Sequence, residues 1–179
     1  PAGYNNVDLA ACAARGLEVA NVPTYASDAM AHMAITQIMA LACSLWPQAQ
    51  ALARGDDAYL RQSHLGRLPH VELTGKTLGL VGGGAGPRGE GASTRGLKRN
   101  PGTIGGRVAA IARCLGMEVV VASPSGRAPP GCAAVGLDEL LERSDFVSVH
   151  CPLNERTKGP PPRGSLGARP VLGARVARL

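Results

Sequence analysis

The chain has 179 residues, of which 45% are hydrophobic, 18% charged and 3% aromatic, and its formal net charge is +6. This composition can bury the core of one domain and part of a second, which excludes wholesale disorder. Five aromatic side chains are too few for a platform that stacks single-stranded nucleic acid.

The positive charge is concentrated in residues 85–103 and 159–179, whereas the rest of the chain is nearly neutral. We therefore expect no nucleic-acid partner. Five cysteines without CxxC spacing favour a reducing environment, in the cytoplasm or the interior of an organelle, and four scattered histidines argue against a metal site. No apolar run reaches about 18 residues and no signal peptide is visible, so we expect neither a membrane partner nor a targeting signal.

The first elements are predicted from an Ala-rich segment and a short apolar one. Residues 8–15 end at Gly16, a pattern typical of a short helix closed by a glycine. Residues 17–22 then predict a short strand that ends before Pro23.

A longer helix follows, for which Ser27 and Asp28 suit the N-cap and the first turn. Pro47 should break or kink it near Trp46, and a second helical piece should end near Gly55. The apolar residues recur at helical spacing and predict a core face, although the methionines among them also allow an adaptable binding groove. The predicted face consists of Met30, Met33, Ala34, Ile38, Leu41 and Leu45.

The second half alternates between short apolar strands and helices, which indicates an α/β fold with a partial, doubly wound parallel sheet. We predict strands at 76–81, 117–122 and 145–150, and helices at 104–115 and 137–143. No element is predicted from residue 159 onward, because that segment has no hydrophobic period.

Glycines that follow a strand and open a helix at G-x-G-x-x-G spacing form the turn that receives a dinucleotide's pyrophosphate. Gly82 and Gly84 follow the predicted strand and Gly105 opens the helix, but a long segment separates them. Removal of residues 86–103 or 85–102 restores the spacing. The sequence therefore predicts a dinucleotide-binding turn interrupted by an insertion.

A rival hypothesis is that residues 85–103 are a functional insert. Its four basic residues would then clamp a phosphate, although its Gly-rich, aperiodic composition argues against this. These residues are Arg88, Arg95, Lys98 and Arg99.

Ser123 stands at the end of the next predicted strand, where an acidic residue would bond the ribose hydroxyls of NAD. A small polar residue with Arg127 nearby suits a 2′-phosphate instead, which weakly favours NADPH over NAD. The alternative interpretation is that residues 123–126 form a plain turn and that Arg127 is solvated.

Four segments resemble, in order and spacing, the D-isomer-specific 2-hydroxyacid dehydrogenases, with most similarity to the glycerate dehydrogenase and hydroxypyruvate or glyoxylate reductase branch. The segments are 3–34, 73–84, 104–123 and 137–159. The resemblance implies a partial Rossmann-type NAD(P)-binding domain, a remnant of a second α/β substrate domain, and hydride transfer between NAD(P) and a small 2-oxo or 2-hydroxy acid. Members of the family are commonly dimers, so it also implies a homodimer.

The resemblance assigns residues to a cofactor site and to the loop that holds the substrate carboxylate. The cofactor residues, including those argued above, are Gly82, Gly84, Ile104, Gly105, Ser123, Arg127, His150, Cys151, Pro152 and Thr157. The substrate residues are Ala2 and Gly3.

The family's catalytic Arg motif, Asn-x-x-Arg-Gly, and its later Glu and His have no match in the sequence, so no catalytic residue is assigned. We therefore expect this chain to be truncated relative to the family and to have no catalytic turnover. The alternative function is a non-catalytic nucleotide-binding or dimerising fragment. The expected organisation is a substrate-domain remnant at 1–26, a crossing helix and connector at 27–72, a partial dinucleotide-binding domain at 73–158 with 85–103 inserted, and a non-family basic tail at 159–179.

Overall fold

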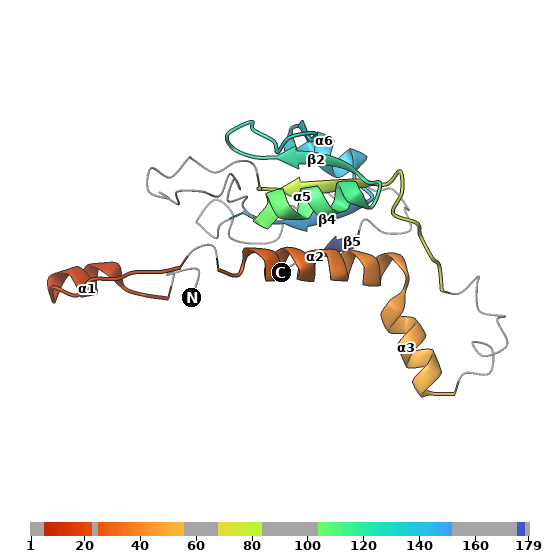
Figure 1. Ribbon diagram of the computed structural model, residues 1–179, viewed down its shortest axis with the longest axis horizontal. Helices are drawn as coiled ribbons and strands as arrows, with labels where there is room; N and C mark the ends of the chain where they lie inside the picture. Colours follow the sequence, from red (N-terminus) through yellow and green to blue (C-terminus); the bar gives the residue numbers. More distant parts are fainter. Residues whose placement is uncertain (1–5, 23–24, 56–67, 84–103, 152–174, 178–179) are drawn as a thin grey trace, which may run out of the picture.

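A parallel sheet forms the centre of the protein in the computed structural model, which describes residues 6–22, 25–55, 68–83, 104–151 and 175–177 (Figure 1). The strand order is β3-β2-β1-β4-β5. The strands are β1 (Thr77–Val81), β2 (Glu118–Ala122), β3 (Ala133–Ala134), β4 (Phe146–Val149) and β5 (Arg175–Ala177). β1 pairs with β2 on one side and with β4 on the other, so the chain reverses its direction of winding between β1 and β4.

Helices cover both faces of this sheet, which explains why β1 and β2 each contain three consecutive buried residues. α5 (Ile104–Cys114) and α2 (Ser27–Ala42) pack together on one face, and α6 (Leu137–Arg143) packs on the other. Alternate side chains of β1 divide between the two layers, because Leu78 and Leu80 join the α2–α5 core whereas Gly79 lies beneath Leu140 of α6.

The expected α/β fold with a parallel sheet is therefore correct, and the predicted strands and helices of the second half agree with β1, β2, β4, α5 and α6 to within one or two residues. β3 and β5 were not predicted. β5 corrects the expectation of no element after residue 159, since Phe146 to Ser148 of β4 pair with Arg175–Ala177. Segments of two or three residues are too short to show a period.

α1 (Leu9–Ala14) confirms the first predicted helix. The Asp8 carboxylate accepts a hydrogen bond from the Ala11 N–H at 2.9 Å, and Gly16 has a left-handed φ of 66°. The strand predicted at 17–22 is wrong, because that segment pairs with no other strand of the described residues, and Leu17 is 58% exposed. An apolar segment becomes a strand only where a neighbouring strand completes its hydrogen bonds.

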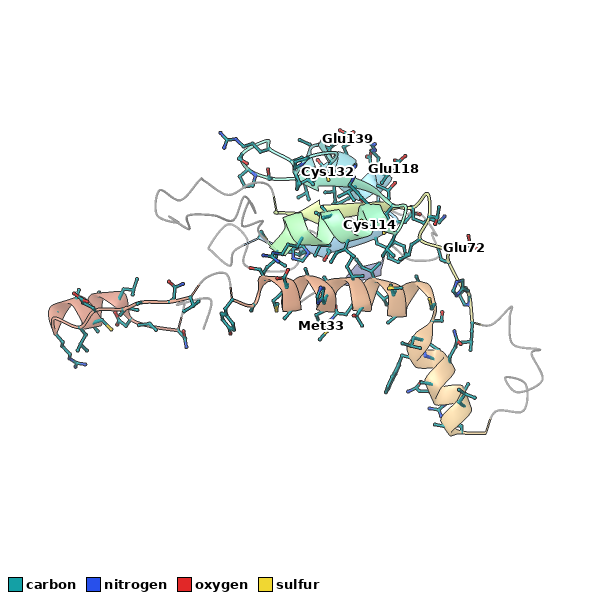
Figure 2. The ribbon with its side chains drawn as sticks, viewed as in Figure 1. Met33, Glu72, Cys114, Glu118, Cys132 and Glu139 are labelled. Carbon is teal, nitrogen blue, oxygen red and sulfur yellow. The ribbon has the colours of Figure 1, made fainter. Side chains whose placement is uncertain are left out.

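α2 begins at Ser27 with Ala26 at the N-cap, so the prediction that Ser27 caps this helix is wrong. The predicted core face is also only partly correct. Ala34 and Ile38 are buried, but Met33 is 51% exposed and points away from the sheet (Figure 2). The buried face of α2 combines Ser and Ala residues with Ile35 and Ile38, and it packs in one core with the mostly small buried residues of α5.

The break predicted near Trp46 is present but lies slightly earlier, between Ala42 and Leu45. α2 ends at Ala42, α3 (Leu45–Ala53) follows at 65°, and Ser44 between them has a φ of 51°. Pro47 lies in the first turn of α3, where a backbone N–H has no partner within the helix and its loss costs little. The predicted end near Gly55 is correct, since α3 stops at Ala53.

Within the described residues, no single helix is long and apolar enough to cross a membrane, and only the bent pair α2–α3 passes that test when its two helices are taken together. α2 uses its apolar residues in the core against α5. α1 and α3 contain no buried residue, and Figure 1 shows them at opposite ends of α2.

Candidate dinucleotide-binding site

The carboxyl ends of β1 and β4 lie side by side where the winding of the sheet reverses, which is where open α/β sheets bind their ligands. Backbone hydrogen bonds join the segments that leave these strands. The His150 N–H donates to the Val81 carbonyl and the Gly82 N–H donates to the Ala122 carbonyl, each at 2.8 Å. The ends of β1, β2 and β4 therefore form one edge.

The two separated parts of the glycine motif meet at this edge. A Cβ built on Gly105, the second residue of α5, would lie 2.5 Å from the Cα of Gly83. Only glycines allow such an approach of helix and turn. The structure thus brings Gly82 and Gly105 together, as the spacing argument predicted. It adds Gly83, which sequence reasoning missed although three successive glycines mark the place.

Gly82 has a φ of 83° and lies against the backbone that follows β4. A Cβ at this position would lie 2.8 Å from the Cys151 nitrogen and 2.9 Å from the His150 carbonyl carbon. Both the conformation and the space therefore require glycine.

α5 begins at this edge with Ile104, which packs against the core, and its first turn carries no acidic residue. The positive end of its dipole is thus available for an anion. Arg107 of α5 forms an ion pair with Asp28 of α2, which fixes the first turn of one helix against that of the other. The Nε of Arg107 is buried, and no group among the described residues bonds to it.

A closed turn follows β2. The Ser123 hydroxyl donates to the Arg127 carbonyl at 2.9 Å and lies 3.2 Å from the Ser125 hydroxyl, while the Gly126 N–H donates to the Ser123 carbonyl at 3.0 Å. The Arg127 side chain is exposed, and residues 123–127 contain no carboxylate. This turn and the exposed Arg127 agree with the alternative interpretation of residues 123–127, and the role of Ser123 and Arg127 toward a cofactor stays a prediction.

His150 is half-buried beyond the end of β4, and its Nε2 lies 2.9 Å from the hydroxyl of Ser148. Burial lowers the pKa of His150, so the imidazole is neutral at pH 7. Cys151, the next residue, is also half-buried and borders Gly82. Sequence reasoning missed Ser148, for which a single polar residue within an apolar strand was the only signal.

Five of the predicted site residues lie outside the described residues, so their placement stays a prediction. They are Ala2, Gly3, Gly84, Pro152 and Thr157. Among the residues that the structure does describe, no three His, Cys, Asp or Glu side chains are grouped to hold a metal ion. Of the labelled cysteines, Cys114 is the last residue of α5, whereas Cys132 lies in the segment just before β3 (Figure 2).

A parallel sheet in this order, with a glycine turn where its winding reverses, defines a Rossmann-type dinucleotide-binding domain. Residues 100–161 match the NAD binding domain of the D-isomer specific 2-hydroxyacid dehydrogenases. The relatives described next extend this similarity to D-isomer-specific 2-hydroxyacid dehydrogenases over most of the chain.

The relatives extend over most of this chain. It is 30% identical to a hydroxypyruvate reductase of Blautia hydrogenotrophica, over 88% of this chain and 44% of that protein. It is 34% identical to a D-3-phosphoglycerate dehydrogenase of Mycobacterium tuberculosis, over 88% of this chain and 26% of that one. A solved structure from work on the pyruvate reductase of Chlamydomonas reinhardtii matches with a TM-score of 0.64 and 33% identity, over 87% of this chain and 40% of its own. The chain spans less than half the length of these relatives.

Proposed function

We propose that the chain binds a nicotinamide dinucleotide at the edge formed by Gly82, Gly83, Gly105 and the residues after β4. The observation that carries the proposal is the contact between Gly83 and Gly105, which places a glycine turn against the start of α5. There the positive end of the dipole of a helix N-terminus suits a pyrophosphate. When bound, the nicotinamide would supply or accept a hydride.

We further propose that NADPH is preferred over NADH. A carboxylate at the end of the second strand would bond the ribose hydroxyls of NADH and repel a 2′-phosphate. The turn after β2 has Ser123 there instead, and it presents the exposed cation Arg127 four residues later.

The cofactor preference is tested by titrating the full chain with NADPH and with NADH and following nicotinamide fluorescence. We expect NADPH to bind about tenfold more tightly, and Arg127→Ala to remove most of that difference, since a charged hydrogen bond is worth roughly 1.5–3 kcal/mol. Arg54→Ala, at the end of α3, is the matched control and should change neither affinity. Equal binding of the two cofactors would refute the preference, and failure of both to bind would refute the site.

The substrate proposed for the whole protein is a small 2-oxo acid, hydroxypyruvate or glyoxylate, interconverted with its D-2-hydroxy acid. Relatives named hydroxypyruvate reductase and glyoxylate reductase support this choice. For these 179 residues themselves we propose binding without turnover, because no Asn-x-x-Arg-Gly motif is present. An assay with hydroxypyruvate, glyoxylate and either reduced cofactor should show no rate above background, and a measurable rate would overturn the proposal.

The alternative, a non-catalytic protein that dimerises, is favoured by one observation. Large apolar side chains remain exposed on the faces of α2 and α3 turned away from the sheet, with Trp46 70% exposed and Met33 51%. Such surfaces often mark an interface. Sedimentation of the wild type and of Trp46→Ser tests this interface, since a dimer formed through α3 should dissociate in the variant. The turnover assay above decides whether such a dimer is catalytic.

A further inference from the structure

The hydroxyl of Ser148 is the starting point, because it is wholly buried in β4 and yet close to the candidate site. Its only hydrogen-bond partner among the described residues is Nε2 of His150, at 2.9 Å. Ser148 follows Phe146 by two residues, so both side chains point to the α2–α5 side of the sheet, and His150 continues that row. The imidazole therefore lies on the side of the sheet from which α5 approaches Gly83.

The direction of this hydrogen bond decides which nitrogen of His150 carries hydrogen. A hydroxyl hydrogen with no access to water requires an acceptor, and a neutral imidazole has one acceptor nitrogen. If Nε2 donated to Ser148, the buried hydroxyl hydrogen would have no acceptor among the described residues. If Ser148 donates to Nε2, the buried hydroxyl hydrogen has an acceptor. A doubly protonated ring is disfavoured by the same burial, which lowers the pKa of His150.

We propose that Ser148 donates to Nε2 of His150 and thereby holds the ring as the neutral tautomer with hydrogen on Nδ1, which donates to an oxygen of the bound dinucleotide. Ser148 is then a positioning residue and His150 a binding residue. The role of Ser148 rests on the buried Ser148–His150 pair alone. The role of His150 as a donor to the dinucleotide rests on the proposed function.

The position of His150 supports its role as a donor to the dinucleotide. Its peptide N–H is already used by the Val81 carbonyl, and its carbonyl carbon lies against Gly82. The side-chain Nδ1 is thus the donor that His150 has left, and among the described residues no group accepts from it. A ring held at the edge beside a phosphate-binding turn presents that donor where phosphate and ribose oxygens would lie.

The tautomer is tested first, in the protein without cofactor, by long-range nitrogen–proton NMR correlation of the histidine rings, with His150→Asn to assign the signal. We expect a pyrrole-type Nδ1 and a pyridine-type Nε2 at neutral pH. Ser148→Ala should abolish this preference. Ser144→Ala is the matched control, since it removes a hydroxyl that donates to the Leu140 carbonyl at 2.6 Å, on α6, and should leave the ring unchanged. A pyrrole-type Nε2 in the wild type, or an unaltered ring in Ser148→Ala, overturns the role of Ser148.

The donor role is tested by NADPH titration of two variants that differ in where they place an amide nitrogen. The amide of Asn falls near the position of Nδ1, and that of Gln falls near Nε2. We expect His150→Asn to stay within about threefold of the wild-type affinity and His150→Gln to lose about tenfold, as for one hydrogen bond to a charged acceptor. The reverse order overturns the donor role. If the wild type binds no NADPH, the proposed function and the donor role fail together, while the tautomer still decides the role of Ser148.

Discussion

At the residue scale, Gly82 combines a conformational and a packing requirement that can be measured separately. Ala at a φ of 83° costs about 1–2 kcal/mol, and its Cβ would collide with the backbone of His150 and Cys151, which cannot rotate aside. Gly55→Ala is the matched control, because Gly55 has a φ of 64° and nothing lies within 4 Å of a Cβ there.

We therefore expect Gly82→Ala to lower the free energy of unfolding by about 3 kcal/mol or more, and Gly55→Ala by about 1 kcal/mol. Urea denaturation of the two variants measures the difference. Equal losses would mean that the turn moves away from β4 without cost.

His150 makes stability depend on pH. Its pKa in the folded protein is lowered by burial, below the unfolded value of about 6.5. As pH falls below 6.5, the unfolded chain takes up a proton that the folded chain does not. The free energy of unfolding is therefore at its full value above pH 6.5 and decreases as pH falls toward the folded pKa.

Denaturation should therefore give a lower free energy of unfolding at pH 5 than at pH 7 in the wild type. This difference should be smaller in His150→Gln and unchanged in His32→Gln, which alters an exposed residue. A drop of the same size in all three proteins would assign it to other groups.

Several of these residues could be found from sequence, and the reason differs for each. Gly82 and Gly105 were predicted because the turn's spacing is set by the chemistry of a pyrophosphate. Ser148 was not, since its role comes from burial and from one partner two residues away. Gly79 was not either, because only the packing of α6 shows that a Cβ there would clash with the Ser144 hydroxyl and the Leu140 side chain.

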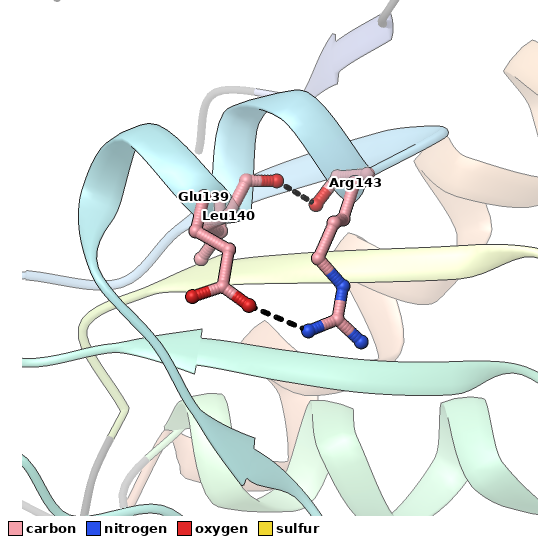
Figure 3. Close-up of polar contacts among 4 residues, drawn as sticks. Glu139, Leu140 and Arg143 are labelled. Atoms are coloured by element: carbon pink, nitrogen blue, oxygen red, sulfur yellow. Dashed lines mark hydrogen bonds and ion pairs between the residues drawn. The ribbon is translucent and has the colours of Figure 1, made fainter.

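At the element scale, α6 packs on the sheet mainly through Leu140, its one fully buried side chain, with Leu141 partly buried beside it. Leu140 is fully buried against Val120 and Val147, whereas Leu137 on the same helix is 43% exposed. Figure 3 shows the polar contacts of this helix, in which Arg143 pairs with Glu139 at 2.7 Å and the Ser144 hydroxyl bonds the Leu140 carbonyl.

Leu140→Ala should lower the free energy of unfolding by about 2–5 kcal/mol, because it removes apolar contact and leaves a cavity over Gly79. Leu137→Ala should cost about 0.5 kcal/mol or less. Chemical denaturation measures both. A small loss in Leu140→Ala would mean that α6 collapses onto the sheet and fills the space.

The period of apolar residues predicted the elements of the second half because each of them packs within the described residues. The same reasoning failed for 17–22 and for the core face of α2, where the outcome depends on partners. A strand needs a neighbouring strand, and the buried face of α2 is decided by the small residues of α5 opposite it.

At the scale of the whole molecule, residues far apart in sequence build one edge. β1 and α5 meet at Gly83 and Gly105, although a long segment separates these residues, and β4 closes the edge from the other side. The parallel sheet was expected from the alternation of strands and helices, whereas the strand order and this contact come from the structure alone. It also gives the insertion hypothesis a physical test.

Deletion of residues 86–103 joins Ala85 to Ile104 and restores G-x-G-x-x-G spacing between Gly82, Gly84 and Gly105. Because Gly83 and Gly105 already touch, the shorter connection should be accepted without moving α5. Loop-closure entropy should then raise the free energy of unfolding by on the order of 1.5–2 kcal/mol. NADPH should bind at least tenfold more tightly, because the turn now directs its N–H groups at the pyrophosphate.

Deletion of 86–102, which leaves one residue more, is the control for loop length alone. It should gain the same stability without the gain in affinity, since its glycine spacing is wrong by one position. If affinity instead falls in both deletions, the removed segment contributes to binding through its basic residues, and the functional insert becomes the correct hypothesis. Affinity that rises equally in both would show that loop length, rather than the geometry of the glycine turn, limits binding.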